Sequence, residues 1–254
     1  MRDPTQRFSD RVENYAKYRP GYPTELYGYL REESGLRGSS NVADLGSGTG
    51  LLSQLFLERG HRVYAVEPND EMRSAAEAHF LENENFISLK GRAEAIPLAN
   101  QSVDFLVAGQ SFHWFEPVAA KSEMRRVLAA GEEVALIWNR RDMENSPFQR
   151  AYEQLLERFG TDYLQVDQQR RVSDEKMVAF FAPQLMKKAS FPNRQTLDAE
   201  GLRGRLLSSS YVPLPDDRNY ASMLAALDEL FAKFQQNGQI HFDYLTTVYH
   251  APIH

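Results

Sequence analysis

Residues 42–50, VADLGSGTG, place an acid and three glycines directly after a short apolar run. Glycine has no side chain, so a loop of this kind brings bare backbone close to a bound molecule. The dinucleotide fingerprint G-x-G-x-x-G needs a third glycine where Leu51 stands, and a P-loop needs a lysine that this loop lacks. Asp44 would also repel a pyrophosphate, so the loop favours a ligand that carries a positive charge.

Glu67 supplies a second acid at the end of a later apolar run, 21 positions after Gly46. A carboxylate at this place can accept hydrogen bonds from both hydroxyls of a ribose. Ala93 and Glu94 follow the next apolar run, where an adenine ring could lie against backbone and small side chains. A cofactor that contains an adenosine therefore suits all three segments.

In the order and spacing of these features the sequence resembles class I S-adenosylmethionine (SAM) methyltransferases. VADLGSGTG is similar to the first motif of that superfamily and VYAVEPNDEM to the second. GRAEAIPLANQSVDFLVAGQSFHWF resembles the adenine loop and fourth strand, and RRVLAAGEEVALIWN resembles the helix–strand turn R-V-L-x-P-G-G without its proline. These segments cover residues 41–140. YAKYRPGYP and the FHWF tetrad look like the small-molecule branch that includes trans-aconitate methyltransferase-like proteins.

The resemblance implies SAM as the cofactor and gives roles to the matching residues. Asp44 would hold the methionine end of SAM, and Glu67 would bind its ribose diol. Tyr18 and Arg19 would close a flap over the pocket, although a surface helix with ordinary aromatic packing explains them equally well. The predicted cofactor residues, from the glycine loop to the adenine and methionine contacts, are Asp44, Gly46, Ser47, Gly48, Gly50, Glu67, Pro68, Asn69, Ala93, Glu94, Gln110, Tyr18 and Arg19.

Several residues follow predicted strands at the same edge and could meet the methyl acceptor. His113 could take a proton from a hydroxyl acceptor, whereas a carboxylate acceptor needs no base and most isolated histidines are structural. Asn139, Arg140 and Arg141 could bind an acidic acceptor, because a guanidinium pairs bidentately with a carboxylate; solvent-exposed charge is the alternative. Trp114 and Tyr211 would form walls of the acceptor site.

The composition narrows the chemistry further. The 254 residues include no cysteine, which excludes disulfides, thiolate metal sites and cysteine nucleophiles, and no metal is expected. The net charge of -6 gives no whole-chain field that favours nucleic acid. The segment GQSFHWF also differs from the N/D-P-P-Y/F loop that grips a flipped amine in nucleic-acid methyltransferases.

We therefore expect a SAM-dependent methyltransferase that acts on a small-molecule acceptor, either an acid or a hydroxyl compound. A tRNA methyltransferase and a non-catalytic SAM-binding regulatory protein are the alternatives. The polar first residues lack the apolar core of a signal peptide, and no window approaches the roughly 18 apolar residues of a membrane span. These features predict a cytoplasmic monomer or homodimer with no membrane partner and no nucleic-acid partner.

The residues with chemical roles fall at the ends of alternating strands and helices. Apolar runs at 41–46, 61–68, 85–91, 102–110 and 132–140 are typical of buried strands, and amphipathic helices separate them. This rhythm predicts a parallel sheet that is covered on both faces and binds ligands at the carboxyl ends of its strands.

Together with the resemblance, the pattern predicts an α/β fold: a Rossmann-like, doubly wound sheet of seven strands, mostly parallel with an antiparallel last strand. We expect a single methyltransferase domain over residues 1–254. Within it, residues 1–40 would form a helical flap and 41–140 the SAM-binding core. Residues 141–185 would form a helical lid insertion and 186–254 the C-terminal part of the sheet.

Overall fold

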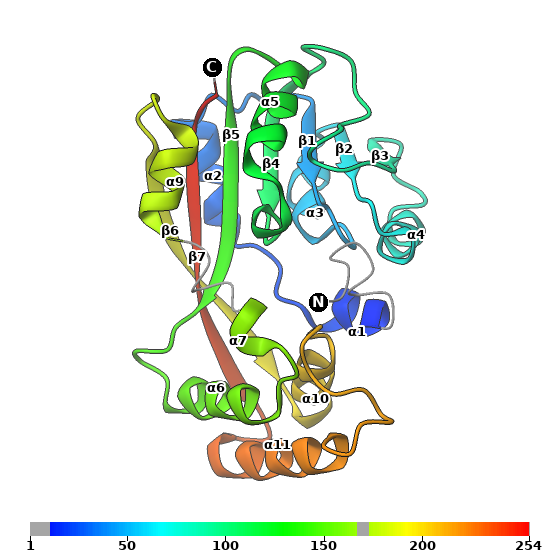
Figure 1. The fold of residues 1–254 in the computed structure, drawn as a ribbon, viewed down its shortest axis with the longest axis vertical. Helices are drawn as coiled ribbons and strands as arrows, with labels where there is room; N and C mark the ends of the chain where they lie inside the picture. Colours follow the sequence, from blue (N-terminus) through cyan, green and yellow to red (C-terminus); the bar gives the residue numbers. More distant parts are fainter. Residues whose placement is uncertain (1–10, 167–172, 254) are drawn as a thin grey trace.

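The computed structural model describes residues 11–166 and 173–253, which form one seven-stranded sheet with helices around it (Figure 1). The strand order is β3-β2-β1-β4-β5-β7-β6. The first five strands are parallel, and β7 runs antiparallel to both of its neighbours. The predicted sheet is therefore confirmed. Its strands are β1 (Val42–Leu45), β2 (Val63–Val66), β3 (Phe86–Leu89), β4 (Val103–Gly109), β5 (Leu128–Arg141), β6 (Lys187–Leu197) and β7 (Ile240–Pro252).

The order of the strands reverses between β1 and β4. The chain passes from β1 to β2 and β3 on one side, and then returns to β4 and β5 on the other side. In a doubly wound sheet such a reversal leaves a crevice at the carboxyl ends of the strands. All four residues of β1 are buried, so the loop that follows β1 starts from a rigid strand.

Helices cover both faces of the upper sheet. Leu26 and Phe56 belong to the core on one face, and Met124 and Phe180 belong to the core on the opposite face. The first pair lies on α2 (Thr24–Glu33) and α3 (Leu51–Leu57), and the second pair on α5 (Pro117–Val127) and α9 (Asp174–Phe181). A further helix, α4 (Asp70–His79), packs beside β3.

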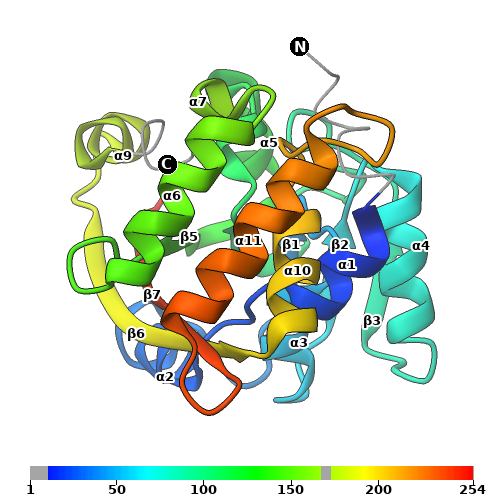
Figure 2. The same ribbon diagram turned by 90° about the horizontal axis from the view of Figure 1, so that it is seen from below.

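The long strands β5, β6 and β7 continue below this sheet and carry a second core. Figures 1 and 2 show helices lying across the lower end of the molecule, and we call these helices, with the strand ends under them, the lower lobe. Tyr152, Leu202, Leu227 and Phe242 are fully buried in its core. The helices are α6 (Pro147–Phe159), α7 (Tyr163–Val166), α10 (Ala199–Leu207) and α11 (Tyr220–Phe234).

The segment 141–185, predicted as one helical lid, contributes to two different cores. α6 packs against α11 in the lower lobe, whereas α9 packs against the upper sheet. The apolar faces of these helices were readable from the sequence, but their partners lie far away along the chain. Residues 167–172 of the predicted lid, 1–10 of the predicted flap and 254 lie outside the described residues.

The N-terminal helix α1 (Val12–Tyr18) lies against the lower lobe. Arg11 donates from Nη2 to the carbonyl oxygen of Val212 at 2.6 Å, and Lys17 pairs with Glu200 of α10 at 3.2 Å. The flap is therefore held to α10 and the segment after it. Among the helices formed by the described residues, none is both long and apolar enough to cross a membrane.

Candidate functional site

A pocket opens at the carboxyl ends of β1, β2, β4 and β5 and extends down to the flap and the lower lobe. Loops from the upper sheet form one half, which we call the cofactor half. Side chains from α1 and Arg19 after it, from the end of β5 at Arg141, and from α7, α10, β7 and the segment 208–211 form the other half, the acceptor half. The pocket brings together fifteen of the predicted residues: Asp44, Gly46, Ser47, Gly48, Glu67, Pro68, Asn69, Ala93, Glu94, Gln110, Arg19, Trp114, Asn139, Arg141 and Tyr211.

The glycine loop after β1 takes a conformation that ordinary side chains resist. Gly46 has a φ of +66°, and a Cβ at this position would lie 2.6 Å from Cβ of Ser111. Gly48 has a φ of +58°, and the space around its missing side chain is open. The N–H groups of Gly46 and Ser47 donate to the carbonyl oxygen of Val66, which fixes the loop to the end of β2. The turn is thus fixed by packing at Gly46 and presents bare backbone at Gly48.

Asp44 is a buried carboxylate with unused hydrogen-bonding capacity. Its side chain is 1% exposed, and Oδ2 accepts a hydrogen bond of 2.7 Å from Oγ of Ser53. Oδ1 has no hydrogen-bond partner among the described residues. Burial raises the pKa of Asp44 to about 7 against the hydrogen bond from Ser53, and the nearby Glu67 adds to the rise. A cationic group in the pocket would supply the missing partner.

Glu67 ties the glycine loop to the start of α4. Oε2 accepts from N–H of Gly48 and Oε1 from N–H of Asn69, both at 2.8 Å. Burial raises the pKa of Glu67, although these two N–H groups act against the rise. Each carboxylate oxygen can accept a second hydrogen bond, so the group retains capacity for a ligand diol.

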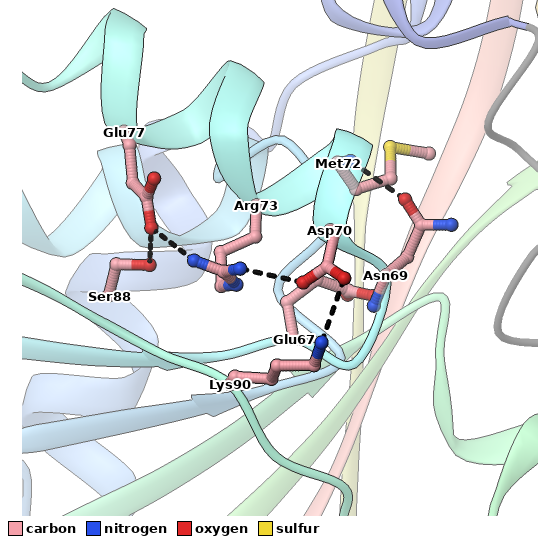
Figure 3. A network of polar contacts seen from close by, with 8 residues as sticks. All are labelled: Glu67, Asn69, Asp70, Met72, Arg73, Glu77, Ser88 and Lys90. Carbon is pink, nitrogen blue, oxygen red and sulfur yellow. Dashed lines mark hydrogen bonds and ion pairs between the residues drawn. The ribbon is translucent and has the colours of Figure 1, made fainter.

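A network of polar contacts fixes the turn that carries Glu67 (Figure 3). Asn69 caps α4 by accepting a hydrogen bond of 2.8 Å from N–H of Met72. Arg73 pairs with Asp70 at 2.7 Å, and Lys90 from beyond β3 pairs with the same carboxylate at 2.8 Å. These contacts hold the helix start and therefore the position of Glu67.

Gln110 lies between the two halves of the pocket. Its backbone adopts a left-handed conformation with a φ of +57°. The side-chain amide donates from Nε2 to the carbonyl oxygen of Asn139 at 3.1 Å, whereas the buried Oε1 has no partner among the described residues. An uncommon backbone conformation maintained at a ligand-binding edge is typical of a functional position. Gln110 thus offers one acceptor oxygen to a bound molecule.

The acceptor half contains two deeply placed arginines. The side chain of Arg141, at the end of β5, is 10% exposed and binds Glu153 at 2.5 Å and the hydroxyl of Tyr163 at 2.7 Å. Arg205, on α10, is 4% exposed and donates from Nε to the hydroxyl of Tyr244 at 3.2 Å. This half of the pocket is therefore cationic, whereas the cofactor half is acidic.

Several known proteins are similar to this chain. Residues 43–136 match the model of a methyltransferase domain. An uncharacterized methyltransferase of Mycobacterium bovis is 39% identical over 141 residues, which cover 56% of this chain and 55% of the relative. The chain thus spans about half the length of that curated relative. An uncharacterized methyltransferase of Schizosaccharomyces pombe is 28% identical over 95% of each protein. Residues 43–136 therefore form a methyltransferase domain, and the chain is similar to class I SAM-dependent methyltransferases.

Solved structures of this superfamily share the fold of the whole chain. A proposed type II methyltransferase from Anaeromyxobacter dehalogenans is 25% identical, with a TM-score of 0.63 over 92% of this chain and 96% of that protein. A proposed methyltransferase from an antibiotic biosynthesis pathway of Anabaena variabilis is 18% identical, also with a TM-score of 0.63, over 94% of this chain and all of that protein. The second likeness shows the fold alone.

The cofactor half of this methyltransferase domain fits SAM, the cofactor of the superfamily. SAM carries positive charge on its sulfonium and ammonium groups, and Asp44 Oδ1 is a buried acceptor without a protein partner in the described chain. Its ribose diol needs acceptors of the kind that Glu67 offers. The open space beside Gly48 lets backbone approach a ligand. Asp44, Glu67 and Gln110 are therefore the side chains we expect to hold the cofactor.

Two predicted acceptor residues lie outside this pocket, so their predicted placement is wrong. His113 lies on the short helix η3 (Phe112–Trp114) and lines a separate groove with residues of α5 and α9, whereas its neighbour Trp114 reaches the pocket. Arg140 binds the hydroxyl of Tyr249 at 2.9 Å. Side chains alternate along a strand, so Asn139 and Arg141 share the face toward the pocket and Arg140 points to the opposite face.

Two predicted cofactor residues also lie outside the lining. Gly50 has a φ of +84° at the start of α3, and a Cβ there would collide with the ring of Phe80, so its role is in packing. Tyr18 donates from its hydroxyl to Glu200 at 2.8 Å. Arg19 does reach the pocket, where it donates from Nε to Oγ of Ser208 at 2.9 Å.

Part of the acceptor half carried no clear signal in the sequence. Arg205 lies between Leu202 and Leu206, both fully buried, on the inward face of α10. An arginine at an apolar position of an amphipathic helix was a readable signal, because such a charge needs a partner. The tyrosines gave no comparable signal, since buried tyrosine is common in ordinary cores. The lining residues with polar side chains that the sequence did not indicate are Tyr22, Arg92, Ser111, Tyr163, Arg205 and Tyr244.

Proposed function

We propose that this chain transfers a methyl group from SAM to a small-molecule acceptor held in the acceptor half of the pocket. The observation that carries the proposal is the continuity of the two halves. The cofactor half, with Asp44 and Glu67, opens directly into a second space lined by Arg141, Arg205 and Tyr244. A protein that only bound SAM would not need such a space.

The side chains of the pocket act by holding and orienting. SAM supplies an electrophilic methyl group, and an acceptor that is already nucleophilic needs little acid–base help. Asp44 and Glu67 fix the cofactor, and Gln110 stands where the two halves meet. Placing two reactants in a productive orientation contributes up to about 7–11 kcal/mol to lowering a barrier. The proposal therefore assigns these residues to positioning rather than to proton transfer.

The enclosure of the acceptor half favours a small acceptor over tRNA. Tyr163, Arg205 and Tyr244 are each less than a tenth exposed. The flap covers the pocket from the side, because Arg19 binds Ser208 and Arg11 binds the carbonyl oxygen of Val212. A nucleotide that remains attached to a polynucleotide would need an open entrance for its flanking phosphates.

Two measurements test the proposal in sequence. Calorimetry with SAM and with its demethylated product S-adenosylhomocysteine (SAH) should show micromolar binding, and an absence of heat with both would refute the cofactor site. Transfer from methyl-labelled SAM is then measured with small carboxylic acids, with phenols and with bulk tRNA. Label on a small acceptor supports the proposal, whereas label on tRNA alone contradicts it. The Asp44→Asn variant, which should lose both binding and transfer, controls for contaminating enzymes.

A further inference from the structure

The two deep arginines of the acceptor half have donors that no group of the described residues accepts from. Nε of Arg141 and Nη1 of Arg205 are buried and lack hydrogen-bond partners among the described residues. Arg141 uses Nη2 for both Glu153 and Tyr163, and Arg205 uses Nε for Tyr244. A buried N–H of a charged group without an acceptor is costly, so it points to a partner that binds there.

A structural arginine of the same chain shows the contrast. Arg126 donates from Nε to Glu123, from Nη1 to the carbonyl oxygen of Leu98, and from Nη2 to that of Ile96 and again to Glu123. All three of its nitrogens are thus engaged, and it lies away from the pocket. Arg141 and Arg205 are more buried than Arg126, whose side chain is 32% exposed, and yet make fewer contacts.

The charges of the acceptor half do not balance within the described chain. Arg19, Arg141 and Arg205 all line the pocket, and among the described residues Glu153 is the one carboxylate that pairs with any of them. Arg19 instead donates to the hydroxyls of Ser208 and Ser209 and to a backbone carbonyl. Taking a charge out of water costs several kcal/mol unless a counter-charge compensates it. A site with more buried guanidinium groups than carboxylates is therefore completed by an anion.

We propose that Arg141 and Arg205 bind a carboxylate of the methyl acceptor, so that the acceptor is a small organic acid. This inference rests on the proposed function, because it names the class of molecule that the acceptor half takes. The two unpartnered donors match the two oxygens of one carboxylate, which guanidinium groups bind in short, charge-assisted hydrogen bonds. The methylated atom is a separate question, because a carboxylate that anchors the acceptor leaves its other groups free to face the cofactor half.

Tyrosines around the two arginines complete the site. Tyr211 and Tyr163 pack with their ring centroids 4.8 Å apart, and both line the pocket with Tyr244. Burial acts to raise the pKa of Tyr211, but the nearby Arg141, Arg19 and Arg205 outweigh it and lower the pKa. The arginines thus impose a positive potential on this wall, while the rings offer apolar surface to the carbon skeleton of an acid.

Ligand pairs that differ only in charge test the inference on protein saturated with SAH. The pairs are adipate with adipamide and hexanoate with hexanamide, and phenyl phosphate serves as a different anion. We expect the two acids to raise the melting temperature and to shift NMR signals of the pocket, whereas their amides do neither. Equal effects of acid and amide would overturn the inference, as would stabilisation by phenyl phosphate far beyond that by either acid.

Substitutions assign the effect to the arginines. Arg205→Met and Arg141→Met should weaken acid binding at least about tenfold, the scale of a charged hydrogen bond, and leave SAH binding within about twofold. Arg203→Met is the matched control, because Arg203 lies on the same helix, is half-exposed and pairs with Asp228. Arg203→Met should leave acid binding unchanged. A preference for acid over amide that survives in both pocket variants would overturn the inference.

The stability of the variants without ligand distinguishes a binding role of Arg205 from a structural one. Removing an uncompensated buried charge leaves a fold equally stable or more stable, so Arg205→Met without ligands should melt no lower than wild type. If Arg205→Met fails to fold, the charge is needed for folding. Arg205→Lys then tests the inference, because lysine keeps the charge but lacks the planar pair of N–H donors that binds a carboxylate. Arg205→Lys that binds acids as well as wild type overturns the inference. Failure of the proposed function can be distinguished from failure of this inference, because the wild type would then not bind SAH.

Discussion

Asp44→Asn should strengthen the unliganded fold and at the same time abolish cofactor binding. Asn resembles the protonated form of Asp, so the substitution removes the buried negative charge and keeps the shape of the side chain. Asp44 is 1% exposed and one of its oxygens has no partner in the described chain, so its charge is poorly compensated until a cation binds. The carboxylate of Asp44 thus lowers the stability of the unliganded fold and lies where a cationic group of the cofactor can pair with it.

The expected magnitude follows from the pKa of Asp44, which burial raises from 3.8 to about 7. The folded state holds the proton to a higher pH than the unfolded state does. The cost to folding is therefore absent below pH 3.8, grows as the pH rises and is complete above about pH 7. Three pKa units correspond to about 4 kcal/mol as an upper limit, because each unit is about 1.4 kcal/mol.

Urea denaturation of wild type and Asp44→Asn between about pH 5 and about pH 8 measures this cost. The stability of the variant relative to wild type should increase with pH and then level off above pH 7. Asp104→Asn is the control, since Asp104 lies on the adjacent β4 with its side chain 29% exposed and outside the pocket. Parallel pH curves for wild type and Asp44→Asn would refute the reasoning.

Cofactor binding tests the protonation of Asp44 independently of the urea experiment. SAH keeps the ammonium group of the cofactor, and its binding should draw Asp44 into the charged form. Near pH 7 the wild type should release up to about half a proton on binding, and its affinity should fall about tenfold for each pH unit below that. Calorimetry in buffers of different ionisation enthalpy detects the proton. Binding to wild type without proton release would place the cation elsewhere.

Four further variants distinguish residues that hold the cofactor from residues that only pack. Glu67→Gln should weaken SAH binding by about 1.5–3 kcal/mol in calorimetry, because an amide cannot accept from both N–H groups and a ribose diol; unchanged affinity would remove Glu67 from the site. Gly46→Ala should lose about 1–3 kcal/mol of stability in urea, since its Cβ would lie 2.6 Å from Ser111, whereas Gly48→Ala meets open space and should lose less. His113→Ala should keep SAH affinity and turnover within about twofold, because His113 lines another groove; a large loss would return it to the mechanism.

The cofactor half was predictable because its residues follow their strands directly. Asp44, Glu67 and Gln110 each lie within one or two residues of a strand end, and the apolar pattern located every strand of the upper sheet. Parallel strands bring their carboxyl ends to one edge of the sheet, so residues that directly follow these strands are expected to lie at that edge. Three residues far apart in sequence could thus be assigned to one pocket without knowledge of side-chain contacts.

The acceptor half was not predictable in the same way. Arg205 and Tyr244 come from α10 and β7, which reach the pocket only because the long strands carry the lower lobe below the sheet. No local sequence pattern predicts which helix packs against which strand. Arg140 and Arg141 could have been separated from the sequence, because alternation along β5 already requires that Arg141 share a face with Asn139.

The pocket divides its charge between its two ends, and this division orients whatever binds. Asp44 and Glu67 lie at the end formed by the upper sheet, and Arg141 and Arg205 lie at the end formed by the lower lobe. Two unit charges about 4 Å apart near a protein surface interact by about 4 kcal/mol, so a cation placed among the arginines or an acid placed beside Asp44 is strongly disfavoured. Neither end can neutralise the other across the pocket, because Asp44 keeps an unpartnered oxygen and Arg205 an unpartnered nitrogen within the described chain. The buried charges that weaken the unliganded protein therefore select a cation at one end and an anion at the other.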